Sequence, residues 1–283
     1  MNEPTERIQK IRRDNVKIRL IIFGTLAAAL LVCSIFCEHL TPCDPYLQDL
    51  MNAKAAPSAE HLLGTDRYGR DMLSRVIVGS KTSIYSTLLL VAVTTVLGTG
   101  VGVFCGWHGR WIDMVLMRIS DMFLAFPGLV FALAVAGVLG GGLQNAIIAL
   151  AAISWPKYAR IARSQTLSQK EMPYLRAARL SGSGTFKIIF RHILPNIIGP
   201  ILVTAMLDIG TMMMELAGLS FLGLGAKPPT AEWGSMMSDT RSLLTTAPWV
   251  TLSPGFAIFV SVMIFNLLGD TVRDWADPKS RGR

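Results

Sequence analysis

Asp208 and Glu215 stand inside a long apolar stretch of the sequence, residues 197–220. Their spacing equals two helical turns, so both carboxylates share one face if the stretch is helical. A carboxylate near the centre of a bilayer costs at least about 2.5 kcal/mol, and such residues usually face a bundle interior or a wet cavity. The pair therefore indicates either the lining of a translocation path, where two acids can guide a divalent cation, or an interhelical pairing or a place near the membrane edge.

Other residue types that bind metals are scattered along the chain. No pair of histidines has ligand spacing, and the cysteines form no CxxC pair (His39, His61, His108, His192, Cys33, Cys37, Cys43 and Cys105). We interpret the cysteines as packing residues, with a metal site or a Cys37–Cys43 disulfide as the alternatives. The run Met212–Met214 offers thioethers, which suit Cu(I) better than Ni²⁺, and we favour packing as its explanation. We expect no metal site, so that a metal would pass through without strong binding.

The sequence contains no pattern for nucleotide chemistry or for catalysis. It lacks the GxxxxGK[ST] phosphate loop, so we expect the chain neither to bind nor to hydrolyse ATP, and we expect no cofactor and no catalytic residue. The net charge of +8 lies in blocks between apolar runs, without a basic and aromatic module. That pattern favours the positive-inside rule over a nucleic-acid partner.

The elements that must position Asp208 and Glu215 are membrane helices. The 283 residues are 51% hydrophobic and 16% charged, with a mean hydropathy of +0.45, which is typical of a chain in lipid. Six apolar spans are predicted, at 20–37, 83–106, 119–139, 143–156, 197–220 and 251–268. Pro127 should kink the third span, and the short fourth should continue beyond Pro156 as a helix into water. The predicted fold is an all-α polytopic bundle of six transmembrane helices.

The distribution of Lys and Arg predicts the orientation of this bundle. Most of them fall in segments that share one side of the membrane if the N-terminus is cytoplasmic (1–19, 107–118, 157–191 and 273–283). Because positive residues are enriched in cytoplasmic loops, both termini should be cytoplasmic.

The longest cytoplasmic loop, about 157–196, contains the basic stretch RAARLSGSGTFKIIFRHILPN. Its composition allows two short helices joined by a turn at Gly182 and Gly184. On composition alone it is either a docking element or a basic patch that only fixes the orientation.

This stretch resembles the cytoplasmic coupling loop of ABC importer permeases. The residues in register with that loop are Arg176, Ala177, Ala178, Gly182, Leu194 and Pro195. Arg176 stands where the family has Glu, and His192 stands where it has Ile. The resemblance implies that the loop inserts into a groove on an ATPase subunit.

Three further stretches resemble the peptide/nickel branch of these permeases. They are HLLGTDRYGRDMLSRVIVGSKTS (61–83), SFLGLGAKPPTAEWG (220–234) and FNLLGDTVRDWADP (265–278). The first looks like an outer-face signature, carried by Gly64, Asp66, Gly69, Arg70 and Asp71, and its alternative interpretation is an amphipathic surface segment. We therefore identify the chain as a C-type permease subunit of this branch, by resemblance.

The resemblance implies a type I ABC importer permease fold in a bacterial inner membrane, working by alternating access. It implies a permease core at 80–272, preceded by residues 1–79 with the first helix and the outer-face segment, and followed by a tail at 273–283. The implied partners are a second, non-identical permease in a heterodimer, two ATPase subunits that use ATP and Mg²⁺, an extracytoplasmic substrate-binding protein, and membrane lipid. The chain itself should not be an enzyme.

The cargo is less sharply indicated. ARLSGSG (178–184) and LDIGTMMMELAGLSFLGLGAKPPTAEWG (207–234) lean toward nickel or a nickel chelate. A dipeptide or oligopeptide importer is the alternative. An ion-coupled secondary transporter should show an internal repeat with broken helices, which we do not find, and a membrane anchor without transport would leave Asp208 and Glu215 unexplained.

Overall fold

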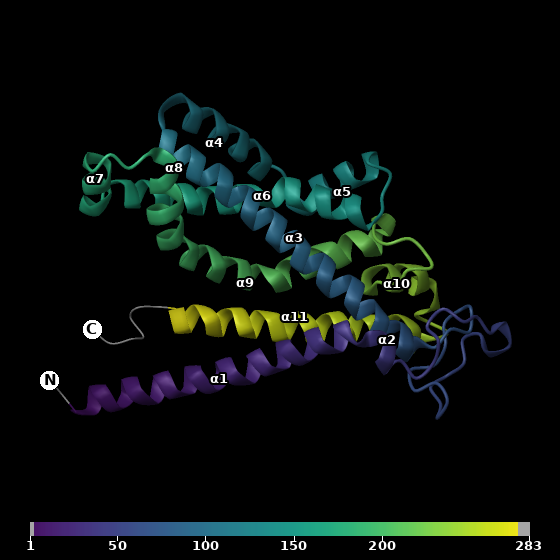
Figure 1. Cartoon of the computed structure of the whole chain (residues 1–283). Helices are drawn as coiled ribbons and strands as arrows, with labels where there is room; N and C mark the ends of the chain where they lie inside the picture. Colours follow the sequence, from purple (N-terminus) through teal and green to yellow (C-terminus); the bar gives the residue numbers. More distant parts are fainter. Residues whose placement is uncertain (1–2, 277–283) are drawn as a thin grey trace.

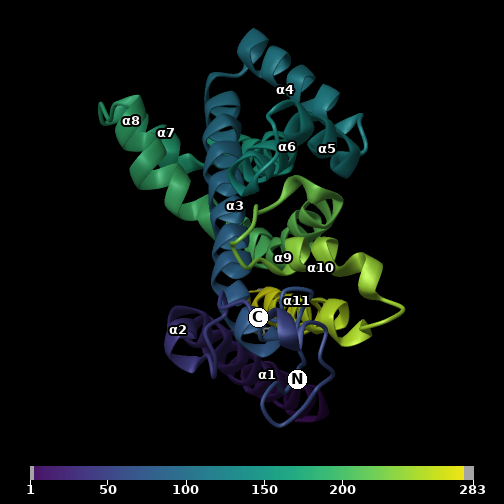
Figure 2. The ribbon, with the colours of Figure 1, turned by 90° about the vertical axis from the view of Figure 1, so that its right-hand side faces the viewer.

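The computed structural model describes residues 3–276, with side chains from residue 16 onward, and its regular elements are helices. Most of the longer helices run along a common direction, and α3 (Met72–His108) crosses them obliquely (Figure 1 and Figure 2). The helices are α1 (Glu3–Ile35), α2 (Cys37–Leu40), α3 (Met72–His108), α4 (Arg110–Leu124), α5 (Gly128–Val138), α6 (Leu143–Lys170), α7 (Pro173–Leu180), α8 (Thr185–Ile188), α9 (Leu194–Leu219), α10 (Trp233–Thr240) and α11 (Pro248–Ala276). The π-helical turn Ile189–Ile193 joins α8 to α9, and a second, Ser220–Leu224, follows α9.

The bundle has two different ends. The start of α1 and the end of α11 lie at the same end as α7 and α8, which we call the α7 end (Figure 1). The opposite end carries α10 and the long connection at residues 41–71, and we call it the α10 end. The start of α1 and the end of α11 thus share an end with the predicted coupling loop, and that both termini are cytoplasmic stays a prediction. The predicted tail lies outside the described residues beyond Ala276.

Four helical stretches between residues 3 and 276 are long and apolar enough to cross a membrane. They are Val16–Ile35, Met72–His108, Thr185–Leu224 and Pro248–Ala276. They correspond to the predicted spans at 20–37, 83–106, 197–220 and 251–268, and α3 and α11 extend beyond the predicted bounds.

The two remaining predicted spans differ from the prediction. The third is broken, because α4 and α5 meet at 93° beside Pro127, and it makes a fifth crossing only if the pair counts as one. The predicted extension of the fourth span beyond Pro156 is confirmed, since α6 continues to Lys170. Its apolar part is short, however, and Lys157 and Arg160 follow, so α6 falls short of the composition of a span. The count of six spans is not confirmed.

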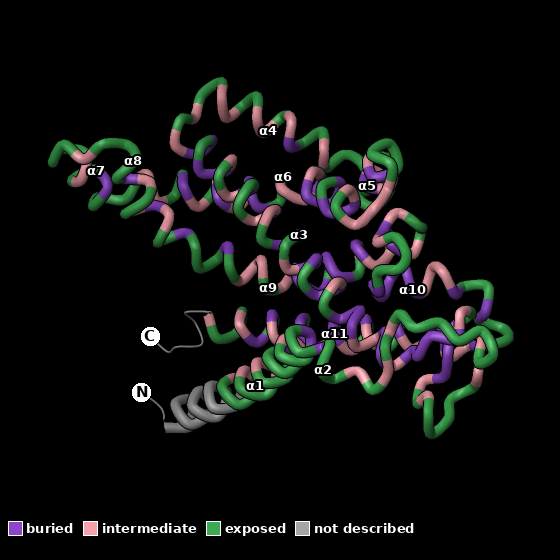
Figure 3. Tube along the Cα trace, turned by 45° about the vertical axis from the view of Figure 1, so that its right-hand side comes forward, coloured by how far each residue is buried: buried purple, intermediate pink, exposed green. Residues whose placement is uncertain are grey.

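α3 is the central helix of the bundle. It packs along α6 and also contacts α9, α11 and α1 (Figure 2). Buried residues gather where these helices meet, whereas α1 is largely exposed at the periphery (Figure 3).

Glycines let α3 approach α6 closely. A Cβ atom on Gly98 would lie 2.5 Å from the Trp155 carbonyl oxygen and 2.6 Å from Cβ of Tyr158, and one on Gly102 would clash with the Ala159 carbonyl oxygen. Gly100, between them, has nothing within 4 Å of its Cβ position. Small residues at such crossings bring helix backbones into contact, which favours association in lipid.

These crossings yield a direct test of the packing. We expect Gly98→Ala to destabilise the protein by about 1–3 kcal/mol, because the added methyl group overpacks the contact with α6. Gly100→Ala, on the same helix, should leave stability unchanged or raise it slightly, since Ala favours helix over Gly. Thermal unfolding of both purified variants in one detergent measures this. Equal melting temperatures for the two variants would contradict the packing.

Candidate functional site

The α7–α8 element, by which we mean residues 173–193 including the π-helical turn, projects from the α7 end and is anchored by buried side chains. Leu175, Ile188 and Ile193 are almost fully buried. α7 starts with Pro173, shortly after α6 ends at Lys170, and a proline is tolerated there because the first backbone N–H groups of a helix need no partner within it. Lys170 Nζ donates to the Trp107 carbonyl oxygen at 2.6 Å and ties the end of α6 to the end of α3. The element is thus a fixed projection of the bundle.

The outward face of this element is apolar as well as basic. Leu180 is 90% exposed, Phe186 76% and Phe190 55%, and the two phenylalanine rings stack at 4.7 Å. Arg179 and Lys187 of the same element are also exposed, and the Arg179 guanidinium lies 4.8 Å from the centroid of the Trp107 ring. Large apolar side chains grouped on a surface mark an interaction site.

The predicted coupling residues all lie on this element or at its return into α9. Arg176, Ala177 and Ala178 are on α7, and the exposed Arg176 pairs with Glu171 at 3.1 Å. Leu194 and Pro195 open α9. Their role in coupling stays a prediction.

Gly182 makes the turn between α7 and α8. Its φ of +76° lies in the left-handed region, which glycine adopts without strain. Gly184, two positions later, has an ordinary φ of −68°.

Asp208 lies at the centre of a polar contact between α6 and α9. Its carboxylate is 2.5 Å from Lys157 Nζ and accepts a hydrogen bond of 2.8 Å from the Tyr158 hydroxyl. The Asp208 side chain is 8% exposed and that of Lys157 is 52% exposed, so the charge pair sits at the edge of the packed interior. This is the interhelical pairing that the sequence left open for Asp208.

Glu215 lies on the same helix and is half-buried. Within residues 3–276 it makes no hydrogen bond or ion pair, in contrast to Asp208. That Asp208 and Glu215 line a translocation path stays a prediction. Lys157 and Tyr158 were not predicted from the sequence as the partners of Asp208. The one signal for them was their position directly after the short apolar run of α6, where polar side chains come within reach of a neighbouring helix.

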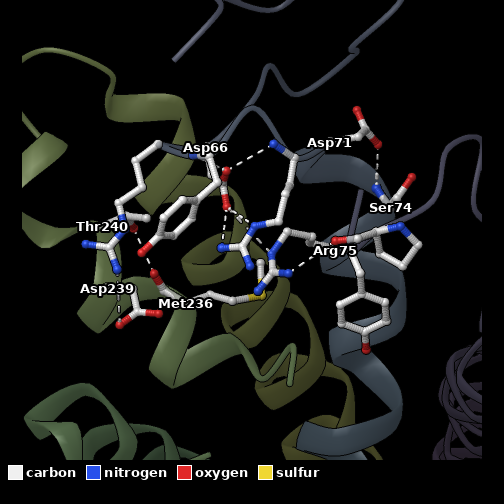
Figure 4. A network of polar contacts seen from close by, with 12 residues as sticks. Asp66, Asp71, Ser74, Arg75, Met236, Asp239 and Thr240 are labelled. Atoms are coloured by element: carbon white, nitrogen blue, oxygen red, sulfur yellow. Dashed lines mark hydrogen bonds and ion pairs between the residues drawn. The ribbon is translucent and has the colours of Figure 1, made fainter. Parts of the chain in front are cut away.

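At the α10 end, Asp66 organises a buried ionic network (Figure 4). Its Oδ2 lies 2.6 Å from Arg70 Nη2 and 3.9 Å from Arg75 Nε, while its Oδ1 accepts the Tyr68 and Arg70 backbone N–H groups. Arg75 also donates to the Pro45 carbonyl oxygen at 3.2 Å. One carboxylate with several donors satisfies a buried charge and fixes the connection onto α3.

The rest of the predicted outer-face signature completes this junction. Asp71 caps α3, because its Oδ2 accepts the Ser74 N–H at 2.8 Å. Gly64 and Gly69 have φ of +70° and +72°, and a Cβ on either would collide with neighbouring backbone. The five signature residues are therefore brought together, and their contacts account for the residue types.

α10 is attached to α3 at the same end. Glu232 is buried and accepts the Gly234 and Ser235 N–H groups at 2.8 Å each, while Trp233 Nε1 donates to the Val76 carbonyl oxygen at 2.9 Å. On α2, an exposed hydrogen bond of 2.9 Å from Lys81 lowers the pKa of Glu38. The second resembling stretch ends with Glu232, Trp233 and Gly234, and these residues form the cap of α10 and its contact with α3.

Comparison with known proteins decides the family. Residues 98–282 match the model of the binding-protein-dependent transport system inner membrane component family. The chain belongs to this family.

Curated relatives cover nearly the whole permease. It is 42% identical to the dipeptide transport system permease protein DppC of Alkalihalophilus pseudofirmus, over 98% of this chain and 90% of the relative. It is 40% identical to the glutathione transport system permease protein GsiD of Pectobacterium atrosepticum, over 90% and 85%. It is 41% identical to the nickel transport system permease protein NikC of Escherichia coli K12, over 94% and 95%. The resemblance to the peptide/nickel branch is confirmed.

Solved structures show the same fold at low identity. An inward-facing MetNI methionine ABC transporter chain matches with a TM-score of 0.56 and 18% identity, over 73% of this permease and 98% of that chain. An amino acid ABC transporter with histidines matches with a TM-score of 0.53 and 20% identity, over 70% and 92%. The predicted ABC importer permease fold is confirmed. The predicted boundaries of the permease core, at residues 79/80 and 272/273, stay predictions.

The contact between α6 and α9 in this permease can be tested by charge removal. We expect Lys157→Met to lower stability by about 1–3 kcal/mol, because it leaves the buried Asp208 carboxylate without its cation, although the half-exposed Lys157 is itself screened by solvent. Lys157→Met combined with Asp208→Asn should recover most of that loss. The control, Asp121→Asn, breaks the exposed pair with Arg160 and should cost no more than about 1 kcal/mol. Thermal unfolding in detergent would refute the buried pairing if Lys157→Met and Asp121→Asn had equal effects.

Proposed function

We propose that this chain is the pore subunit of an ATP-driven importer and that its α7–α8 element docks on an ATPase subunit. The observation that carries the proposal is the α7–α8 element itself, a fixed projection with exposed Leu180, Phe186 and Phe190, in a chain of this permease family. Docking there would couple ATP binding, with Mg²⁺, to rocking of the helices between inward-open and outward-open states. The chain itself uses no cofactor and performs no catalysis.

The orientation follows from the same element. The α7 end, with the basic loop, faces the cytoplasm of a bacterial cell, and both termini are cytoplasmic. The α10 end faces outward, where an extracytoplasmic binding protein delivers the cargo. The excess of Lys and Arg in the segments assigned to the cytoplasm supports this orientation.

A second, non-identical permease subunit completes the pore. An apolar recess of about 420 Å³ opens on α9 and α11, lined in part by Met214, Phe221, Met237 and Phe259. A helical partner against this face would bury these side chains, and that supports a second permease subunit, whose difference from this chain rests on the resemblance alone.

The cargo we propose is nickel or a nickel chelate, passed inward from the binding protein. The support is the local likeness of residues 178–184 and 207–234 to nickel permeases and the 41% identity to NikC over almost the full length of both chains. A dipeptide or oligopeptide is the second candidate, favoured by the 42% identity to DppC.

Uptake by whole cells tests the cargo. A host without its own nickel and dipeptide importers would express this chain together with its second permease, ATPase and binding protein. We expect uptake of labelled nickel that excess unlabelled dipeptide does not compete away. Uptake of dipeptide alone would keep the importer and overturn the nickel assignment.

Two glycine variants test the coupling role. Valine at position 182 must adopt a left-handed φ, which costs roughly 1–2 kcal/mol or more. We expect Gly182→Val to lower uptake by about five- to thirtyfold, the factor to which that energy corresponds. Gly184→Val is the matched control, because its φ suits any residue and its Cβ position is open. Equal uptake by the two variants, at equal membrane levels, would argue against coupling through this turn.

A further inference from the structure

Three potential metal ligands meet at the α10 end of the chain, away from the α7–α8 element. The Sγ atom of Cys43, a ring nitrogen of His61 and a carboxylate oxygen of Asp71 all lie within 4.8 Å of one another. They come from three places in the connection between α2 and α3, and the spacing matches no usual metal motif. The sequence predicts no metal site because the fold alone makes these residues neighbours.

The carboxylate is held in place by the start of α3. Asp71 Oδ2 accepts the Ser74 N–H at 2.8 Å as the cap of the helix, so Oδ1 is left to face His61 Nδ1 at 3.0 Å. A ligand whose second oxygen is already hydrogen-bonded is oriented in advance, as metal-binding carboxylates usually are.

The other two ligands are fixed by backbone hydrogen bonds. The Cys43 N–H donates to Ser74 Oγ at 3.1 Å, which ties the cysteine to the first turn of α3. The His61 carbonyl oxygen accepts the Ser58 and Gly64 N–H groups at 2.9 Å each. All three ligand residues therefore sit on a scaffold that does not require an ion to form.

We propose that Cys43 Sγ, His61 Nδ1 and Asp71 Oδ1 bind one divalent transition-metal ion of the zinc, nickel and cobalt class. Thiolate and imidazole select these borderline ions over Mg²⁺ and Ca²⁺, which prefer oxygen ligands alone. Bonds of about 2.0–2.3 Å in a tetrahedral site separate the ligand atoms by roughly 3.3–3.7 Å. The ligand atoms lie within 4.8 Å of one another, so they need to approach by at most about 1–1.5 Å to reach that geometry.

Binding of the ion releases one proton per site to solvent. The neutral His61 ring carries its proton on Nε2 in the bound state, so that Nδ1 can ligate the ion in place of its hydrogen bond to Asp71 Oδ1, and the Cys43 thiol gives its proton to solvent on ligation. Three protein ligands leave a fourth position for water or another ligand, as in exchangeable sites. An ordinary His61–Asp71 hydrogen bond is the competing explanation, and it assigns no part to Cys43.

The burial pattern gives the ion a path of entry. The Asp71 side chain is 2% exposed and that of His61 is 21% exposed, and Cys43 is half-buried. An ion can therefore reach the site from the α10 end without unfolding of α3. Once bound, it fastens the connection at residues 41–71 to the cap of α3. The site does not depend on whether the cargo is nickel or a peptide.

Cobalt is the probe for the test, because its absorption spectrum reports thiolate ligation. The purified full chain, titrated with Co²⁺, should show thiolate-to-cobalt charge-transfer absorption that saturates at one ion per chain. We expect Cys43→Ser to abolish this absorption. His61→Ala and Asp71→Asn should weaken binding at least about tenfold, and Asn still caps the helix. Cys33→Ser, at an exposed cysteine of α1, is the control and should bind like the unmodified protein.

A second measurement guards against misfolded variants. In a chain that keeps Cys43 and has serine at the other three cysteine positions, saturating Zn²⁺ should slow alkylation of Cys43 at least about tenfold. The same chain with His61→Ala should lose most of this protection while keeping its melting temperature without metal. The site would be refuted if the unmodified protein showed no thiolate–cobalt absorption, if that absorption survived Cys43→Ser, or if Zn²⁺ gave no protection.

Discussion

The arrangement of this permease depends on how closely its helices approach in lipid. Apolar side chains gain little free energy from meeting each other when the solvent is itself apolar. Close backbone contact at small residues must therefore contribute more of the free energy of helix association. Gly98 and Gly102 supply that contact between α3 and α6. A Cβ on Gly269 would touch the Leu207 backbone, so α9 and α11 meet in the same way. These two crossings, of α3 with α6 and of α9 with α11, fix how these four helices pack in the bundle.

α6 connects the packed centre to the projecting element. It lies against α3 along the glycine face, reaches α9 through Lys157 and Tyr158, and leads after Lys170 into α7. A densely packed helix moves as a unit, because its contacts shift between discrete arrangements and do not deform continuously. A displacement of α7 would therefore be carried along α6 to the neighbourhood of Asp208. Such a displacement would shift Lys157 and Tyr158 of α6 relative to Asp208 of α9, and would therefore strain their polar contact.

Local signals in the sequence predicted the elements better than their relations. Apolar runs located four of the spans, and Pro127 marked the break between α4 and α5, because these features depend on adjacent residues. The partner of Asp208 lies on another helix, and no local pattern encodes that distance. The count of six spans is not confirmed for a related reason, since α6 has too short an apolar part to qualify as a span and packs along α3 instead. The ligand cluster of Cys43, His61 and Asp71 was missed because it exists only in the folded connection.

The junction at the α10 end shows why a signature that looks functional can be explained by folding alone. Its glycines and charges are accounted for by positive φ angles, a helix cap and a buried ion network. Asp71 differs from Asp66 in one respect, because capping α3 uses only one of its two carboxylate oxygens. The second oxygen faces His61, with Cys43 close by. A cap that already stabilises α3 can thus take on an ion at little further cost to the fold, and the ion in turn would reinforce the junction from which α3 begins.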